Sequence, residues 1–110
     1  MTMSGYAVVM SSVGSQEEAS LIARALVERH LAACANVVSG VVSTYRWKGQ
    51  VETEPEWLLI VKTRVDRFEA VRLAIRELHS YELPEIVMIE MRDADPTYLA
   101  WIDDSLAGKP

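Results

Sequence analysis

The sequence has little cysteine, glycine or proline and no long apolar run, and these shortages exclude several classes of protein. Five glycines and four prolines among 110 residues are too few for a collagen-like or low-complexity chain. The apolar run at residues 57–61 has five residues, whereas a membrane-spanning helix needs roughly 20. Residues 1–5 lack the basic start of a signal peptide, and no apolar stretch follows them, so we expect none. Half of the residues are hydrophobic, which predicts one globular domain over residues 1–110.

The charge balance and the single cysteine restrict the partners and the compartment. Cys34 cannot form an internal disulfide, which is typical of a protein in a reducing compartment. The net charge is −5, and seven carboxylates lie between Glu82 and Asp104 with Arg92 as the only cation among them. Such a surface repels phosphate backbones and anionic lipids and tolerates cations. We therefore expect a cytoplasmic protein that binds neither nucleic acid nor membrane.

The first third of the sequence predicts a strand followed by a helix. Residues 6–10 form a short apolar run with β-branched side chains, as a buried strand does. Ser15 is a typical N-cap, and Glu18 three residues later completes a capping box. The helix then continues to about Leu31, because apolar residues recur at helical spacing: Ala19, Ile22, Ala23, Leu26 and Val27.

Residues 33–61 change to a period of two and predict a long hairpin that turns at Lys48-Gly49. Gly40 and Pro55 interrupt the two arms, where they indicate bulges or an unpaired edge. The arm at residues 34–47 would span about 46 Å when extended, whereas a domain of this size has a radius of gyration of about 13 Å. The hairpin therefore projects beyond its own sheet or bends back sharply. A projecting arm with exposed apolar residues favours pairing with a neighbouring subunit, so we expect a closed homo-oligomer.

The remaining segments complete a β-α-β-β-α-β-α order. Asp66 and Glu69 predict a second helix start, and Phe68, Val71, Ile75 and Leu78 form its apolar stripe. A fourth strand follows at residues 85–91, and Asp95-Pro96 opens a C-terminal helix. Two βα units that flank a hairpin predict an α+β fold, the split β-α-β or ferredoxin-like sandwich, with two helices on one face of the sheet.

Candidate metal ligands are few. Copper or zinc requires convergent thiolate and imidazole donors, and the chain has one cysteine and two histidines. Cys34 is a ligand or a small buried hydrophobic residue, and His30 lies in the last turn of the first helix, where a cation complements the macrodipole. His79 is a candidate ligand or a structural cap, and it is followed by three polar side chains: Tyr81, Glu82 and Glu85. The chain has no His-x-x-x-His or Cys-x-x-Cys pair, so a metal site is weak or shared between subunits.

A second candidate site involves the hairpin. Its polar and aromatic side chains line a cleft between subunits or simply pack in an interface; they are Tyr45, Trp47, Glu56 and Lys62. A cleft that combines Lys62 with His79, Tyr81 and Glu85 suits a small anion or metabolite. The motifs of hydrolases, metalloproteases and nucleotide-binding loops are missing from the sequence, so we expect no enzymatic activity.

Five blocks in this order resemble the CutA family of divalent-cation tolerance proteins. They cover residues 31–36 (LAACAN), 43–49 (STYRWKG), 62–63 (KT), 79–86 (HSYELPEI) and 98–102 (YLAWI). Two departures stand out: Ser80 replaces the proline that usually follows the histidine, and residues 11–14 replace a loop that carries cysteine in some relatives. These departures leave fewer soft ligands than the best copper-binding relatives have.

The resemblance implies a ferredoxin-like trimer, similar to the PII signalling proteins, that acts in tolerance to copper or another divalent cation. We therefore expect a homotrimer with Tyr45 and Trp47 in its interface and weak metal binding through His79. The metal is not expected to be required for folding. The alternative is a PII-like signalling or scaffold trimer that binds a small metabolite in inter-subunit clefts, for which the candidate residues are Cys34, Lys62, Tyr81 and Glu85.

Overall fold

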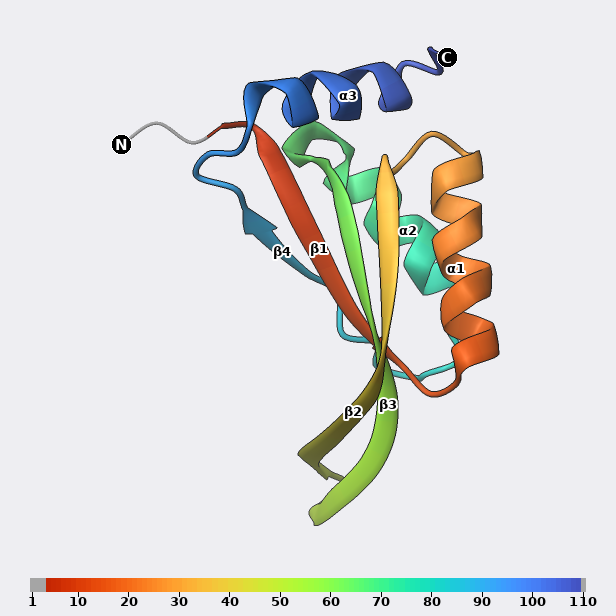
Figure 1. Ribbon diagram of the computed structural model, residues 1–110. Coiled ribbons are helices and arrows are strands. Elements are labelled where there is room, and N and C mark those ends of the chain that lie inside the picture. The colour runs from red at the N-terminus through yellow and green to blue at the C-terminus, as the bar shows by residue number, and fades with distance from the viewer. Residues whose placement is uncertain (1–3, 110) are drawn as a thin grey trace.

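The computed structural model describes residues 4–109, so the two ends of the predicted domain, residues 1–3 and 110, lie outside it. The described chain has a mixed α/β fold whose elements follow the predicted order (Figure 1). They are β1 (Tyr6–Val13), α1 (Gln16–Glu28), β2 (Cys34–Trp47), β3 (Gln50–Arg64), the short 3₁₀ turn η1 (Val65–Arg67), α2 (Phe68–Leu78), β4 (Val87–Glu90) and α3 (Pro96–Leu106).

The four strands form one antiparallel sheet in the order β2-β3-β1-β4. β1 ends at Val13, opposite Trp57 of β3, so the hairpin beyond this pair has no β1 neighbour. Figure 1 shows this part of β2 and β3 projecting away from the helices, and the molecule measures 44 × 32 × 24 Å. The length of the arm allowed a hairpin that projects or one that bends back sharply, and the structure shows the projecting form.

The local geometry of the hairpin follows from its glycines. Two residues lie between Val38 and Val41, where β3 has only one between their partners Leu58 and Glu56, so Gly40, at φ 80°, lies in a β-bulge, as predicted. Pro55 does not interrupt the pairing but lies opposite Val42. At the tip, Lys48 and Gly49 both have positive φ, 50° and 82°, which is the two-residue turn that matches the twist of the strands.

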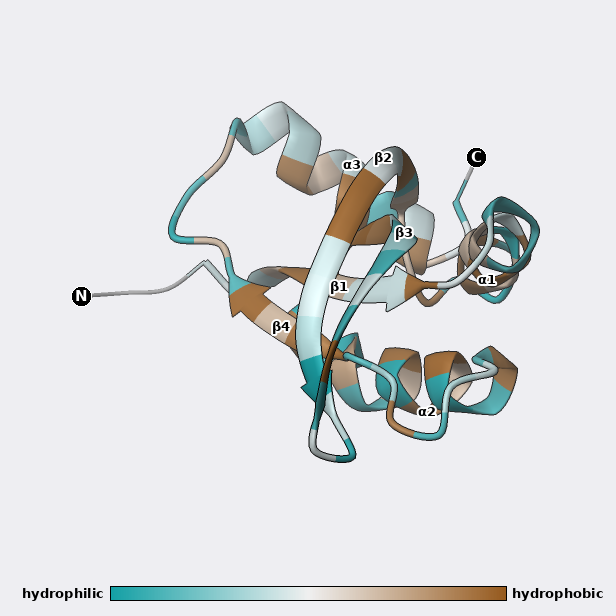
Figure 2. Ribbon diagram, turned by 90° about the horizontal axis from the view of Figure 1, so that it is seen from below, coloured by the Kyte–Doolittle hydropathy of each residue, from teal (hydrophilic) through white to brown (hydrophobic). Residues whose placement is uncertain are grey.

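The main core lies between the sheet and the helices α1 and α2. Alternate residues of β1 are completely buried on this face, and they meet the apolar stripes of both helices. The helix residues of this core are Ala19, Ile22, Leu26, Val71, Ala74 and Ile75. Figure 2 shows α2 and α3 on opposite sides of the sheet.

The other face of the sheet is covered only at one end. There α3 packs through Ile102 and Leu106 against a small cluster that includes Tyr6 and Ala33. Beyond α3, the part of the chain that the structure describes places no helix on this face. Its apolar side chains are half-buried or exposed: Val8, Met10, Leu58, Ile60, Val87 and Ile89.

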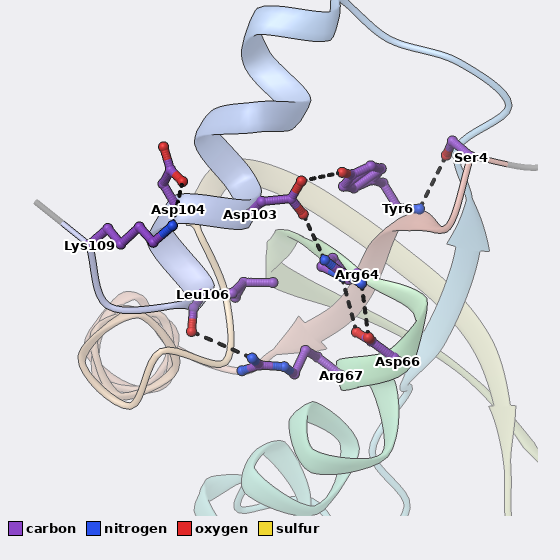
Figure 3. Close-up of polar contacts among 9 residues, drawn as sticks. All are labelled: Ser4, Tyr6, Arg64, Asp66, Arg67, Asp103, Asp104, Leu106 and Lys109. Carbon is purple, nitrogen blue, oxygen red and sulfur yellow. Dashed lines mark hydrogen bonds and ion pairs between the residues drawn. The ribbon is translucent and has the colours of Figure 1, made fainter.

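Polar contacts fix α3 to the sheet (Figure 3). The Asp103 carboxylate accepts a hydrogen bond from the Tyr6 hydroxyl at 2.6 Å and pairs with Arg64 at 2.8 Å. Arg64 also pairs with Asp66 at 3.0 Å. The sequence pattern predicted that Asp66 caps α2, and this prediction is wrong. The guanidinium of Arg64 engages the Asp66 carboxylate, and the N-terminus of α2 has no side-chain cap.

The first helix is shorter than predicted. α1 ends at Glu28, and His30 takes a left-handed conformation, φ 57°, beyond it. The amides of His30 and Leu31 donate to the carbonyls of Val27 and Leu26, which is the Schellman arrangement. The apolar pattern in the sequence continued to Leu31 because its side chain packs against the core, although the residue lies beyond the end of the helix. The fourth strand, β4, is likewise shorter than the predicted 85–91.

A cavity between the hairpin and the loop after the second helix

A cavity of about 780 Å³ opens where the loop after α2 passes beside the projecting hairpin. Its hairpin wall includes the aromatic rings of Tyr45 and Trp47, and the loop wall extends from Ser80 to Glu85. The full lining consists of Ser12, Ser43, Thr44, Tyr45, Arg46, Trp47, Glu56, Ser80, Tyr81, Glu82, Leu83 and Glu85. Two segments that the sequence analysis had singled out separately, residues 43–49 and 79–86, therefore meet at one site.

His79 ties the loop to β1 and is nearly buried, with 8% of its surface exposed. Its Nε2 lies 2.8 Å from the carbonyl oxygen of Ser12, and its Nδ1 lies 3.1 Å from the amide of Tyr81. The carbonyl can only accept and the amide can only donate, so Nε2 carries the proton and Nδ1 accepts. Both ring nitrogens therefore form hydrogen bonds to the backbone, as expected if His79 is a structural cap.

Tyr81 and Glu56 form the central contact of the cavity. The Tyr81 hydroxyl donates to Oε2 of Glu56 at 2.7 Å, and only 7% of the Glu56 surface is exposed. Burial, followed by the hydrogen bond to the Glu56 carboxylate, raises the pKa of Tyr81 well above its usual range. The phenol therefore remains protonated at neutral pH and acts as a hydrogen-bond donor.

Glu18, which is not part of the lining, holds the loop in place through two hydrogen bonds. The Glu18 carboxylate accepts from the amide of Ser80 at 2.7 Å and from its hydroxyl at 3.0 Å. Ser15 caps α1 as predicted by accepting from the Glu18 amide, but the Glu18 side chain serves the loop instead of completing the capping box. Gly14 lies against the Tyr81 ring, and a Cβ there would stand 3.0 Å from the hydroxyl oxygen.

The cavity is acidic. Its lining holds three carboxylates, Glu56, Glu82 and Glu85, against the single guanidinium of Arg46. Glu52 and Glu54 continue the acidic side of β3 and contribute, after burial and together with Glu56, to a raised pKa of the Tyr45 phenol. This charge favours cationic ligands over anions.

The predicted site residues divide into two groups. Tyr45, Trp47, Tyr81 and Glu85 line the cavity, and His79 supports its loop. Lys62 and Cys34 pair with each other on β3 and β2 and are not part of the lining. Lys62 lies four residues along β3 from Leu58, which pairs with Ser12, a separation of about 13 Å. Within one chain, Lys62 therefore does not join the loop residues.

Gly14, Glu18 and Ser12 also contribute to this site, although they were not among the predicted site residues. Ser12 donates its hydroxyl to Glu85 at 3.3 Å, across 73 residues of chain. One of these contacts, the hydrogen bond from the Ser80 amide to Glu18, could have been suspected from the sequence. The family usually has proline at this position, and a proline has no amide hydrogen to donate. Within residues 4–109 no group of three or more His, Cys, Asp or Glu side chains is arranged to hold a metal ion.

Comparison with known proteins places the chain beside one set of relatives. The model of the CutA1 divalent ion tolerance protein family matches residues 7–105. The divalent-cation tolerance protein CutA of Thermus thermophilus is 43% identical over 98 residues, which are 89% of this chain and 95% of that protein. The CutA homolog of Xenopus laevis is also 43% identical, over 83 residues, and there the match spans 55% of the relative's length.

The solved structures agree with the sequence matches. The CutA structure from Xylella fastidiosa superposes with a TM-score of 0.91 at 36% identity, covering 94% of this chain and 99% of the other. Relatives are described as chloroplastic in rice and periplasmic in Archaeoglobus fulgidus, so a cytoplasmic location stays a prediction. No helix of residues 4–109 is long and apolar enough to cross a membrane. The family model and the relative from Thermus thermophilus are named for divalent ion or cation tolerance.

Proposed function

The chain belongs to the CutA1 divalent ion tolerance family, and we propose that it acts in divalent-cation tolerance as a homotrimer that binds copper or another divalent cation weakly. The observation that carries the metal proposal is the acidic cavity whose loop is anchored by His79. Carboxylates concentrate cations, and an imidazole adds preference for copper. Binding is weak because the ring must give up a backbone hydrogen bond to coordinate a metal.

Calorimetric titration with Cu(II) tests this proposal. We expect weak binding to the wild type, its loss in His79→Ala, and unchanged binding in His30→Ala. His30 is the matched control because it is the other histidine and its Nδ1 contacts the Ser105 carbonyl, and neither residue lines the cavity. Equal heats in all three proteins would remove His79 from the site, and heats no larger than those of buffer would refute metal binding altogether.

The trimer proposal rests on the sheet face that α3 leaves uncovered. A monomer rarely exposes a contiguous apolar surface of this kind, whereas subunit interfaces are built from such surfaces. The projecting hairpin exposes two further apolar residues on its opposite side, away from Tyr45 and Trp47: Val42 and Val51, 69% and 63% exposed. We also assign the strand order β2-β3-β1-β4 with α1 and α2 on one face to the ferredoxin-like class, which supports a PII-like assembly.

Light scattering separates the trimer from a monomer. We expect a wild-type mass near three times 12.3 kDa and dissociation in Ile89→Lys, because this residue lies in the uncovered face and its burial stabilises by about 1.5–3 kcal/mol. Tyr45→Asp with Trp47→Lys tests the predicted role of the tip aromatics in the same assay. A wild-type mass near 12.3 kDa would refute the assembly, and a trimeric tip variant would assign the contacts to other residues.

A second candidate function is metabolite binding by a PII-like trimer. The observation that favours it is the size of the cavity, since sites for small molecules are clefts of about 300–1,000 Å³. Thermal-shift measurements with nucleotides, organic acids and amines, each with and without metal, test this function. Shifts produced only by metals would refute it.

A further inference from the structure

The rim of the cavity already holds an ammonium group that belongs to the chain itself. Nζ of Lys48, at the hairpin tip, lies 5.5 Å from the centroid of the Trp47 ring and 3.9 Å from a carboxylate oxygen of Glu82. An aromatic face and a carboxylate around one cation are the two elements of an organic-ammonium site. Trp47 and Glu82 both belong to the cavity lining.

The same combination continues inside the cavity. Tyr45 and Tyr81 present aromatic rings, and the lining carries two more carboxylates at Glu56 and Glu85. Glu56 is 7% exposed, and its Oε1 makes no hydrogen bond to residues 4–109. A carboxylate that has lost most of its water and is only half satisfied by protein attracts a cation strongly.

The ionisation of the phenols points the same way. Burial and the charges of the glutamates on β3 raise the pKa of Tyr45, and burial with the Glu56 hydrogen bond raises that of Tyr81. Burial disfavours a charge of either sign, whereas the carboxylates disfavour a further negative charge in the cavity and favour a positive one. The neutral phenol rings keep the electron-rich faces that bind ammonium groups.

We propose that this cavity binds an organic ammonium ion, with Tyr45 and Trp47 against its alkyl groups and Glu56 and Glu82 balancing its charge. This inference rests on the second candidate function and names its ligand class. A hydrated divalent ion fits less well, because the described residues offer no converging set of three metal ligands. Lys48 then occupies the outer part of the site and competes with the ligand.

Tetramethylammonium is the probe, and tert-butanol is its uncharged counterpart of similar size. Both are titrated into the wild type at constant ionic strength, and the backbone and indole NMR signals are followed. We expect saturable shifts at Trp47, Tyr45 and Tyr81 with tetramethylammonium and none with tert-butanol. Equal shifts with both compounds, or no saturable shift with either, would overturn the proposal.

Variants at the rim sharpen the test. Lys48→Met removes the competing ammonium and is expected to strengthen tetramethylammonium binding roughly threefold or more, whereas Tyr45→Leu weakens it by a similar factor. Lys109→Met is the matched control, because Lys109 forms a similar exposed ion pair with Asp104, also at 3.9 Å, outside the cavity lining. Weaker binding in Lys48→Met than in Lys109→Met would refute the competition.

The outcome is distinguishable from that of the metal proposal. Cu(II) titration of His79→Ala reports on the metal, and tetramethylammonium titration of Tyr45→Leu reports on the ammonium ion. If tetramethylammonium binds and copper does not, the ammonium site stands and the metal proposal fails. If copper binds and tetramethylammonium gives no saturable shift at the cavity, the reverse holds.

Discussion

Replacing Gly14 by alanine tests whether the cavity depends on the close approach of the Tyr81 ring. A Cβ at position 14 would stand 3.0 Å from the Tyr81 hydroxyl oxygen and 3.3 Å from Cε1. The ring is free to turn outward because it is partly exposed, but the turn breaks its 2.7 Å hydrogen bond to the buried Glu56. A hydrogen bond to a charged group contributes about 1.5–3 kcal/mol, and alanine restricts the unfolded chain by about 0.4–1 kcal/mol in the opposite sense. We therefore expect Gly14→Ala to lower the free energy of unfolding by about 1–2 kcal/mol.

Urea unfolding followed by circular dichroism measures this change, and it must be run at one protein concentration because assembly shifts apparent stability. The same substitution in a Tyr81→Phe background supplies the control. Phenylalanine lacks the hydroxyl oxygen that makes the 3.0 Å contact, so Gly14→Ala should there be close to neutral. An equal loss of stability in both backgrounds would show that the cost does not pass through the hydroxyl, and the reasoning would fail.

Three further predictions concern stability. Ser11→Ala should raise the free energy of unfolding by about 1 kcal/mol in urea, because the buried hydroxyl has no partner within the described residues. The Tyr6 hydroxyl and then Arg64 lower the pKa of Asp103, so its contribution is present above the unfolded pKa and lost as the pH falls; Asp103→Asn should flatten the acid limb of the stability profile. The raised pKa of Tyr81 means that stability is lost as the pH rises above about 10, and Tyr81→Phe should show a shallower alkaline decline.

The parts of the fold that depend on residues close together in the sequence were predictable from it. The alternation in β2 and β3, the turn at Lys48-Gly49 and the cap at Ser15 all follow from local backbone preferences, and each is present. The length of the 14-residue arm predicted that the hairpin either projects or bends back sharply, but it did not decide between the two. Tyr45, Trp47, Tyr81 and Glu85 were predicted as candidates on separate segments, and nothing local indicated that they line one cavity.

The rest of the site depends on contacts between distant segments. Glu18 satisfies a local pattern, the capping box, but its carboxylate binds Ser80, 62 residues away, because the loop offers both an amide and a hydroxyl. Lys62 was grouped with the loop residues because it ends the same hairpin that carries Tyr45. The register of β3 against β1 instead places it opposite Val8, and no sequence pattern specifies that register across so long a separation.

The two ring bonds of His79 connect metal binding to the shape of the cavity. A metal at Nε2 would displace the proton now donated to the Ser12 carbonyl, and a metal at Nδ1 would remove the acceptor of the Tyr81 amide. Either bond restrains the loop that carries Tyr81, so coordination must loosen the wall that Tyr81 shares with Glu56. Because linkage is reciprocal, an ammonium ion that requires this wall must in turn weaken metal binding at His79. Adding tetramethylammonium during the Cu(II) titration should therefore reduce copper affinity in the wild type, and unchanged affinity would show that the two sites are independent.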